Sequence, residues 1–336
     1  MAAREITSTV NLCNPDGSLN PETVGWSRRP LHQCNLRGRW LRKKRWEYWC
    51  VMGPDFLFSP TIANVDYAAF GAVYLLEYAA GRPIEKTSLR LFPRRFSMPD
   101  TVQGDLLWEG KGFRLAILDR EAGRHIAFDA DNVAGRPMTA RIDVQRPATQ
   151  DTLNVVIPWD DRTFQFTSKQ NAMPATGHVV WGGTTYLFPP GDTWAVLDFG
   201  RGIWPYRTQW NWAAFSGTSG SDVVGVNMGA RWTDHAETKE NGICLNGRLH
   251  MLLEDVRFTY DPRDFMRPWR MRTTASDAID LTFTPFHQRA ARAQLGLLAA
   301  RTSQCFGHYN GVLRVDGREI AVNAMRGWAE EVIMRW

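Results

Sequence analysis

The stretch DFGRGIWPYRTQWNW, residues 198–212, places one acid, two arginines and three tryptophans within fifteen residues. Its second half alternates with the period of a β-strand, so that Tyr206, Trp210 and Trp212 share one face and polar residues occupy the other. Pro205 excludes regular central pairing at its own position. We therefore expect a strand with one aromatic face near the end of this stretch.

The first half of the same stretch is rich in glycine. Gly200 and Gly202 flank Arg201, which predicts a bulge or tight turn that aims the guanidinium inward. With Trp204 close by, the residues favour an aromatic wall carrying a few fixed polar groups, as a pocket for an apolar molecule requires. The alternative is a well-packed barrel strand whose tryptophans belong to the core.

Length and composition indicate a globular chain with a sizeable core. The 336 residues are enough for two domains or one large β-body, with 44% hydrophobic and 22% charged residues. Fifteen tryptophans are the unusual feature. Tryptophan is enriched where a large apolar ring must also offer a polar edge, as in ligand sites and interfaces.

The net charge is +5, and the densest basic run is RGRWLRKKR, from Arg37 to Arg45. Such a run is compatible with transient contact with an anionic membrane surface or with nucleic acid. The alternative is a solvated loop or edge strand, where lysines discourage edge pairing. Because no nucleic-acid-binding motif accompanies the run, we expect no nucleic-acid partner.

The five cysteines are widely spaced and form no C-x-x-C pair, so we expect neither a disulfide framework nor a zinc site. The N-terminus has no apolar signal region. The longest apolar run, Tyr67 to Ala80, is too short to span a bilayer. These features together favour a reduced, cytoplasmic, soluble protein.

Short alternating segments recur from Arg45 onward, separated by turn signals such as Gly53-Pro54 and Asn246-Gly247. This spacing is typical of a β-sandwich or β-barrel, so we predict an all-β fold with little helix. The credible helical segments are 289–300, which remains ambiguous, and the tail 328–335. The best junction lies near Trp159, which gives domains 1–160 and 161–336.

Polar residues that could carry chemistry gather in the second half of the chain. Antiparallel neighbours would bring Asp198, Arg201, Asn227 and the pair Glu240-Asn241 into one wall of a barrel. A carboxylate paired with arginine stays ionised, whereas one in an apolar pocket keeps its proton and can act as an acid. The structural alternative is a buried Asp198–Arg201 pair that ties two strands together.

Motifs for other reaction classes are missing from the sequence. There is no G-x-S-x-G, no dinucleotide-binding or Walker motif, and no metal-ligand spacing among the seven histidines. We therefore expect no cofactor and no metal. His178, close to a glycine-rich turn, is kept as a candidate acid or base.

Several long motifs resemble the large bacterial family known as domain of unknown function 2804. They are GWSRRPLHQCN, KRWEYW, LDFGRGIWPYRTQWNWA, VGVNMG, TKENG and GWAEEVIMRW. The family is similar, more distantly, to paired lipocalin-like barrels such as carotenoid 1,2-hydratase, tocopherol cyclase, AttH-like proteins and fungal cyclases. The resemblance implies two lipocalin-like antiparallel barrels or strongly curved sheets packed together. It also implies an apolar ligand in a tunnel near the domain junction, without transferring any residue's role.

Two main hypotheses follow for function. In the first, the protein is a cofactor-independent enzyme that hydrates, isomerises or cyclises a terpenoid, polyketide or lipid-like substrate in the second barrel. Glu240 or Asp198 would donate the proton. The residues expected to orient the donor or line the pocket are Arg201, Asn227, Asn241, Trp204, Tyr206, Trp210 and Trp212. In the second, the same pocket belongs to a non-catalytic carrier of an apolar ligand.

Overall fold

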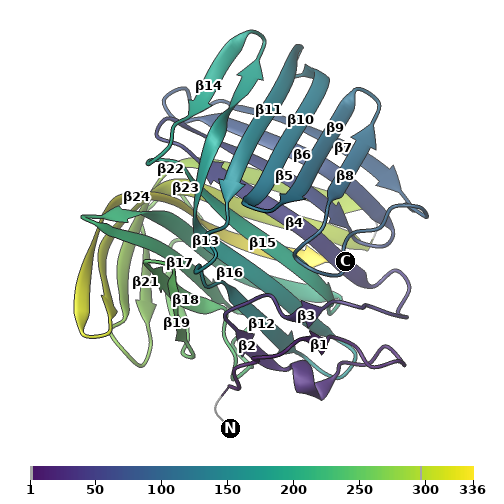
Figure 1. The fold of residues 1–336 in the computed structure, drawn as a ribbon, viewed down its shortest axis with the longest axis vertical. Coiled ribbons are helices and arrows are strands. Elements are labelled where there is room, and N and C mark those ends of the chain that lie inside the picture. The colour runs from purple at the N-terminus through teal and green to yellow at the C-terminus, as the bar shows by residue number, and fades with distance from the viewer. Residues whose placement is uncertain (1–2, 296) are drawn as a thin grey trace.

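The computed structural model describes residues 3–295 and 297–336 and has an all-β architecture, as the sequence predicted. Its strands form two large, strongly curved antiparallel sheets (Figure 1). The first sheet nearly closes into a barrel, and the second is a half-barrel. Within the described ranges the only helical piece is a single 3₁₀ turn, η1 (Pro21–Thr23).

The first sheet contains thirteen strands. Its main path runs β7 (Pro83–Leu91), β6 (Ala68–Glu77), β5 (Phe56–Asn64), β4 (Lys43–Met52), β15 (Trp194–Ile203), β13 (Phe164–Trp181), β11 (Arg136–Gln145), β10 (Gly123–Val133), β9 (Phe113–Arg120) and β8 (Leu106–Gly110). Off this path, β12 (Leu153–Pro158) and β14 (Thr184–Phe188) pair with β13, and β2 (Gly25–Ser27) pairs with β12. A separate small parallel pair joins β1 (Val10–Asn11) and β3 (His32–Gln33).

The second sheet contains nine strands. Their order is β19 (Arg248–Leu252), β18 (Asn241–Leu245), β17 (Asp222–Ala230), β16 (Arg207–Ser219), β24 (Arg318–Arg335), β23 (Leu298–Val315), β22 (Ile279–Leu295), β21 (Trp269–Thr273) and β20 (Val256–Thr259). Figure 1 shows this sheet lying beside the first, with the long strands β22, β23 and β24 extending toward it.

The two segments expected to be the most helical are strands. Residues 289–300 lie largely in the β22–β23 hairpin, where Ala293 pairs with Ala300, and residues 328–335 lie in β24. Helix-forming side chains favour a helix only weakly, and pairing with two long neighbours in a sheet outweighs that preference. Tyr67–Ala80 is mainly strand β6, in agreement with its alternation.

The boundary predicted at residue 160 falls between β12 and β13, which pair with each other. Strands β13, β14 and β15 extend the first sheet, so the chain passes from one sheet to the other between Ile203 and Arg207. The cavity described below is consequently built from both sheets.

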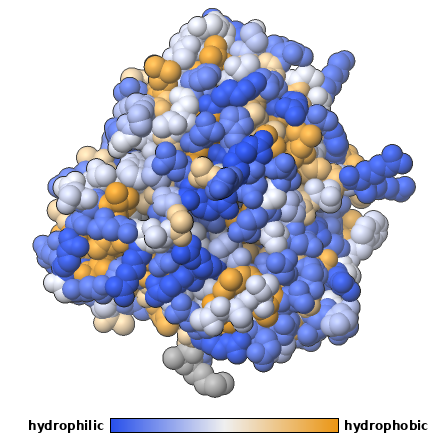
Figure 2. Space-filling view, in the orientation of Figure 1, coloured by the Kyte–Doolittle hydropathy of each residue, from blue (hydrophilic) through white to orange (hydrophobic). Residues whose placement is uncertain are grey.

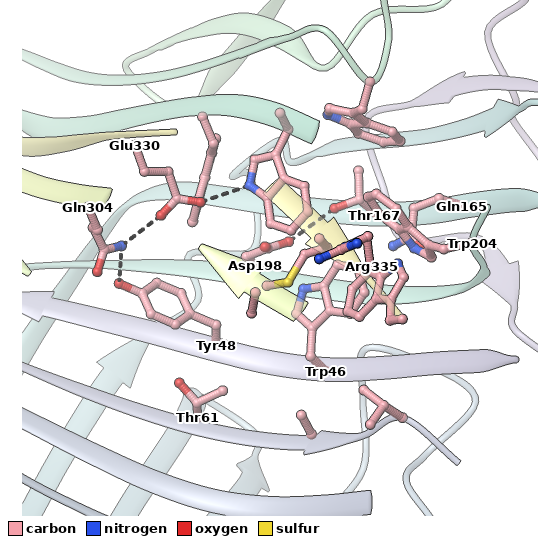
Figure 3. Close-up of a pocket in the computed structure, with 18 of the residues that line it drawn as sticks. Trp46, Tyr48, Thr61, Gln165, Thr167, Asp198, Trp204, Gln304, Glu330 and Arg335 are labelled. Carbon is pink, nitrogen blue, oxygen red and sulfur yellow. Dashed lines mark hydrogen bonds between the residues drawn. The ribbon is translucent and has the colours of Figure 1, made fainter. Parts of the chain in front are cut away.

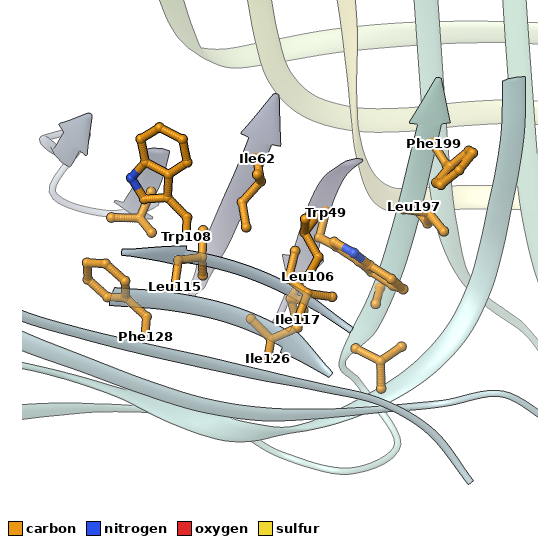
Figure 4. Packing of buried hydrophobic residues seen from close by; sticks show 14 of the residues in the cluster. Trp49, Ile62, Leu106, Trp108, Leu115, Ile117, Ile126, Phe128, Leu197 and Phe199 are labelled. Atoms are coloured by element: carbon orange, nitrogen blue, oxygen red, sulfur yellow. The ribbon is translucent and has the colours of Figure 1, made fainter. Parts of the chain in front are cut away.

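The main core fills the inside of the first sheet (Figure 4). Trp49, Trp108 and Phe128 are fully buried there, and the Arg90 guanidinium covers the Trp108 ring where the two ends of the sheet approach. Trp26, on the N-terminal arm, is also buried, and its strand pairs with β12. The face seen in Figure 2 is mostly hydrophilic, with small hydrophobic patches. No helix in the described part of the chain is long and apolar enough to cross a membrane.

Candidate functional site

A cavity of about 500 Å³ lies between the two sheets. Its walls come from β4, β5, β13 and β15 of the first sheet and from β16, β22, β23 and β24 of the second. Six tryptophans contribute to the walls: Trp46, Trp204, Trp210, Trp212, Trp232 and Trp336. The hypothesis from the residues placed the pocket in the second barrel, whereas the family resemblance implied a position near the domain junction. This cavity lies between the sheets.

The alternation of β15 determines what the first sheet presents to the cavity. Asp198 lines the cavity, and Gly200 follows it on the same face of the strand. A Cβ atom at Gly200 would lie 2.1 Å from the Trp46 ring. One at Gly202 would lie 2.2 Å from Gln165 Oε1. The two glycines therefore make room for Trp46 and Gln165, both of which line the cavity.

Lys169 and Asp198 form a buried ion pair in the cavity wall. They are directly opposite each other on β13 and β15, with Lys169 Nζ 3.0 Å from Asp198 Oδ1. Lys169 Nζ also lies 3.6 Å from Glu240 Oε2 and 3.9 Å from the centre of the Trp212 ring. Burial lowers the pKa of Lys169, but Asp198 and Glu240 outweigh burial and hold it above its ordinary value. Lys169 is therefore a fixed cation.

Glu240 stands at the same cavity from the second sheet. The Trp232 indole donates to its Oε1 at 2.6 Å, while Oε2 has no hydrogen-bond partner among the described residues. Glycine at position 229 is required for this placement, because a Cβ atom there would lie 2.1 Å from Glu240 Oε1. Burial raises the pKa of Glu240 to about 7, against the opposing effects of Lys169 and the Trp232 indole.

Glu330, on β24, is the third acid of the cavity (Figure 3). The Trp210 indole donates to Oε1 at 2.9 Å, and Gln304 Nε2 donates to Oε2 at 3.0 Å. Gln304 also donates to the Tyr48 hydroxyl at 3.3 Å, which links the two sheets. Burial raises the pKa of Glu330 to about 7, against the Trp210 hydrogen bond and the charge of Lys169.

The charges in this cavity favour proton storage close to neutral pH. Lys169 and Asp198 balance each other, so ionising Glu240 and Glu330 would add two negative charges to an aromatic enclosure whose other charged lining residue is Arg335. Burying such charge costs free energy. A fraction of the Glu240 and Glu330 carboxyls therefore stays protonated near pH 7. An arrangement of this kind can both donate and accept a proton next to an apolar ligand.

Of the residues predicted from sequence, five line the cavity together. They are Asp198, Glu240, Trp204, Trp210 and Trp212. Trp204 is the centre of the aromatic group, since its ring lies within 6 Å of those of Trp46, Trp159, Trp210, Trp232 and Trp336.

Arg201 does not lie in the cavity, and the expected Asp198–Arg201 pair does not form. Residues three apart on a strand face opposite sides, so Arg201 points into the first sheet. There it is fully buried and donates to the carbonyls of Pro99, Trp46 and Gly200. Burial lowers the pKa of Arg201 to about 10, and its hydrogen bonds hold the barrel wall.

Tyr206 and His178 lie away from the cavity. Tyr206 is partly exposed, and its hydroxyl donates to the Leu297 carbonyl. His178 is half-buried on β13, opposite Arg141 and Leu187 in the sheet. Neither residue belongs to the cavity lining, so the geometry gives no contact between them and the three acids.

The two predicted asparagines stand behind the cavity wall. Asn227 Oδ1 accepts from the Trp212 indole at 2.8 Å, and its Nδ2 donates to the Glu240 carbonyl at 2.6 Å. Asn241 accepts from the Gly229 N–H and donates to the Glu254 carbonyl. Asn227 thus positions one wall tryptophan and one acid without lining the cavity itself.

Sequence reasoning missed Lys169 and Glu330 as site residues. The polar alternation of Gln165, Thr167 and Lys169 along β13 is the signal that could have indicated a cavity-facing strand. Glu330 lies in the segment 328–335, for which the sequence favours a helix, so its facing direction could not be inferred. No cluster of three or more His, Cys, Asp or Glu side chains suited to a metal ion occurs among the described residues.

Comparison with solved structures finds similar architectures at low sequence identity. A candidate AttH protein from Nitrosomonas europaea is 12% identical with a TM-score of 0.45, covering 86% of this chain and 92% of that one. Kievitone hydratase from Nectria haematococca is 8% identical with a TM-score of 0.47, covering 87% and 88%. CghA is 12% identical with a TM-score of 0.46, at the same coverage as the hydratase.

No curated protein matches the chain. A family model does match, and it extends over residues 3–336, almost the whole sequence. The protein therefore belongs to the family described as Domain of unknown function (DUF2804).

Proposed function

We propose that this protein is a hydratase-like enzyme that acts without a cofactor on an apolar terpenoid, polyketide or lipid-like alkene. The substrate occupies the cavity between the sheets, and Glu240 is the general acid. The observation that carries this proposal is that two buried carboxyls, Glu240 and Glu330, line one aromatic cavity, where burial raises the pKa of each to about 7. A group that titrates near the working pH is the most effective proton donor.

The chemistry begins with proton transfer from Glu240 to one carbon of a double bond, which leaves a carboxylate and a carbocation. Ring faces of Trp204, Trp210 and Trp212 stabilise that positive charge as it develops. In hydration, water adds to the cation and its surplus proton passes to a carboxylate. In isomerisation, a carboxylate removes a proton from the neighbouring carbon instead. Both routes restore one proton to the pair Glu240 and Glu330.

The placement of Lys169 explains why one acid is favoured over the other. Glu240 has an oxygen without a hydrogen-bond donor among the described residues, whereas both oxygens of Glu330 accept hydrogen bonds. The free oxygen, Oε2, is the natural carrier of the transferable proton. Lys169 lies 3.6 Å from it and stabilises the carboxylate formed by proton transfer.

Deuterium incorporation tests this proposal whatever the product is, because every carbon that receives a proton from the solvent acquires the label. Purified protein is incubated in D₂O with a panel of isoprenoid and polyketide alkenes, and mass spectrometry measures deuterium bound to carbon. Carbon protonation by Glu240 predicts incorporation by the wild type that Glu240→Gln abolishes. The matched control is Glu237→Gln, a nearby acid outside the cavity lining.

Binding of panel members without any deuterium incorporation would contradict the enzymatic proposal and favour a carrier. Incorporation that continues unchanged in Glu240→Gln would contradict the assignment of the acid. The same experiment with Glu330→Gln separates the two carboxyls, because the proposal gives Glu330 the role of proton acceptor rather than first donor.

A further inference from the structure

The basic run 37–45 is divided by the structure into an internal part and an external part. Lys43 and Arg45 pair with Asp66 at 3.1 and 3.3 Å, and Lys44 is fully buried. Arg42 donates to the carbonyls of Trp336 and Trp204. These four cations therefore hold the cavity's edge, and they are not available to a partner.

The external part consists of Arg37, Arg39 and Trp40. Both arginines are exposed, and neither has an acidic partner within 4.0 Å in the described part of the chain. Trp40 follows Arg39 directly, and 75% of its surface is exposed. One exposed indole is ordinary, but further exposed apolar side chains beside it would form a patch.

A second segment, far away in sequence, has the same character. Phe92 is 58% exposed and Leu91 is 66% exposed at the end of edge strand β7. Arg94 and Arg95 follow directly, and both are exposed without an acidic partner within 4.0 Å among the described residues. Each segment therefore combines exposed apolar side chains with exposed arginines.

The two segments meet at one groove. Trp40, Phe92 and Arg94 line it, together with Asn64 at the end of β5 and two acids, Asp66 and Asp100. Asp66 is already paired with Lys43 and Arg45. We use the name basic–aromatic rim for the groove residues Trp40, Phe92 and Arg94 with their exposed sequence neighbours Arg37, Arg39 and Arg95. The two segments lie some fifty residues apart in sequence, and the fold brings them together at this groove.

The rim adjoins the cavity through the turn between β5 and β6. Asn64 and Asp66 face the groove, whereas Val65 and Tyr67 line the cavity between the sheets. The cavity-facing row of the first sheet also continues outward, since Ala63 pairs with Phe70 and Phe70 pairs with Leu89, which is 59% exposed. An apolar path thus leads from the cavity wall to the surface beside the rim.

We infer that the basic–aromatic rim docks the protein on an anionic lipid membrane. Arginines attract the negative surface potential of such a membrane, and tryptophan and phenylalanine insert at the headgroup level. Nucleic acid would need the arginines but not exposed leucines that continue an apolar row from a cavity. The inference of membrane docking does not require that the protein is an enzyme. Only the delivery of a lipid-like substrate into the cavity rests on the proposed function.

Vesicle flotation tests this inference with the intact protein. Mixed phosphatidylcholine–phosphatidylserine vesicles are compared with pure phosphatidylcholine vesicles, and the bound fraction is measured. We expect binding to the anionic vesicles only, weakening as salt rises from about 0.1 M to about 1 M and the Debye length falls from about 10 Å to about 3 Å. Arg39→Glu with Arg94→Glu should lower the apparent affinity by roughly tenfold or more.

Trp40→Ala with Phe92→Ala should also release the protein, because insertion needs the apolar rings. The matched controls are Leu187→Ala, a leucine that is 63% exposed on β14, and Arg248→Glu, whose side chain is 71% exposed on β19. These controls should bind like the wild type. The four substituted rim side chains, Arg39, Trp40, Phe92 and Arg94, are all exposed, so circular dichroism should show unchanged folding in every variant.

Three results would overturn docking on a membrane. They are failure of the folded wild type to float with anionic vesicles, equal binding by the rim and control variants, and binding to single-stranded nucleic acid without binding to vesicles. If the rim variants lose vesicle binding while they still incorporate deuterium into a dissolved substrate, that result would support docking through the rim and would leave the proposed chemistry unaffected. If Glu240→Gln loses deuterium incorporation but still binds vesicles, membrane docking does not depend on the proposed acid.

Discussion

Lys169 Nζ lies 3.0 Å from Asp198 Oδ1, and the two residues face each other across neighbouring strands in the wall of the cavity. The pair supplies one fixed cation and one fixed anion to a site that also contains Glu240 and Glu330. The charge on Asp198 contributes to raising the pKa of both glutamates, whereas the charge on Lys169 lowers it. These two effects oppose each other, and burial is the main cause of the raised pKa of both glutamates.

Asp198→Asn should destabilise the fold and lower the pKa of both glutamates. Removing one member of a buried ion pair typically costs about 3–5 kcal/mol, and the nearby Glu240 should keep the loss at the lower end by pairing with Lys169. Chemical denaturation measures the loss. An unchanged denaturation midpoint would show that the Lys169–Asp198 pair contributes little to stability.

Glu240→Gln should be nearly neutral at low pH and stabilising, relative to the wild type, above pH 7. Burial raises the pKa of Glu240 from its ordinary 4.5 to about 7. Its favourable contribution is therefore complete below about pH 4.5 and is lost as pH rises through 7. Across that pH window the difference in free energy of unfolding between Glu240→Gln and the wild type should reach about 2–4 kcal/mol, at roughly 1.4 kcal/mol per pH unit.

Denaturation curves at several pH values between 4.5 and 8 check this expectation, provided the fold survives the acidic end. A stability difference that does not depend on pH would indicate that Glu240 ionises like an exposed acid. Glu237→Gln serves as the control for the loss of one negative charge close to the same strand.

Gly229→Ala should displace the Glu240 side chain without changing its carboxyl group. The new Cβ would lie 2.1 Å from Glu240 Oε1, so Glu240 must move and its bond from Trp232 must break. Overpacking of this kind costs about 1–3 kcal/mol. Gly217→Ala is the control, because its Cβ would meet only the flexible Met325 side chain, at 3.3 Å. Equal stability of the two variants would show that Glu240 has room to relax.

Trp26→Ala should lower the thermal unfolding midpoint by several degrees. Trp26 is buried against Val155, and its loss leaves a cavity worth about 3–5 kcal/mol at the contact between the N-terminal arm and the first sheet. Differential scanning calorimetry measures the shift. A melting curve identical to that of the wild type would mean that the arm is not anchored by this ring.

The fold was largely predictable because alternation and turn signals are local. The strand that follows Pro205, its tryptophan face and strand β6 were all inferred correctly from spacing. The Asp198–Arg201 ion pair considered from the sequence was wrong. Two residues an odd number of positions apart on a strand point to opposite faces, so strand alternation itself argues against the pair.

Other features depend on pairing between distant segments, which spacing does not reveal. Lys169 meets Asp198 only through the register of β13 on β15, and Glu330 enters the cavity only because a helix-prone tail is a strand. The position of the cavity depends on how the two sheets pack. Glu240 was one of two candidate proton donors proposed from the sequence, but its partner Trp232 becomes visible only in the structure.

Glu240 is buried in the cavity wall, and burial raises its pKa to about 7. Carbon-13 NMR of glutamate side-chain carboxyls, recorded across a pH series for the wild type, Glu240→Gln and Glu330→Gln, tests it directly. Burial raises the pKa of each acid to about 7, so two glutamate signals should titrate near neutral pH, and each variant should remove one of them. If all glutamate signals of the folded wild type titrate near the ordinary value of 4.5, the account of this cavity as an acid–base site is contradicted.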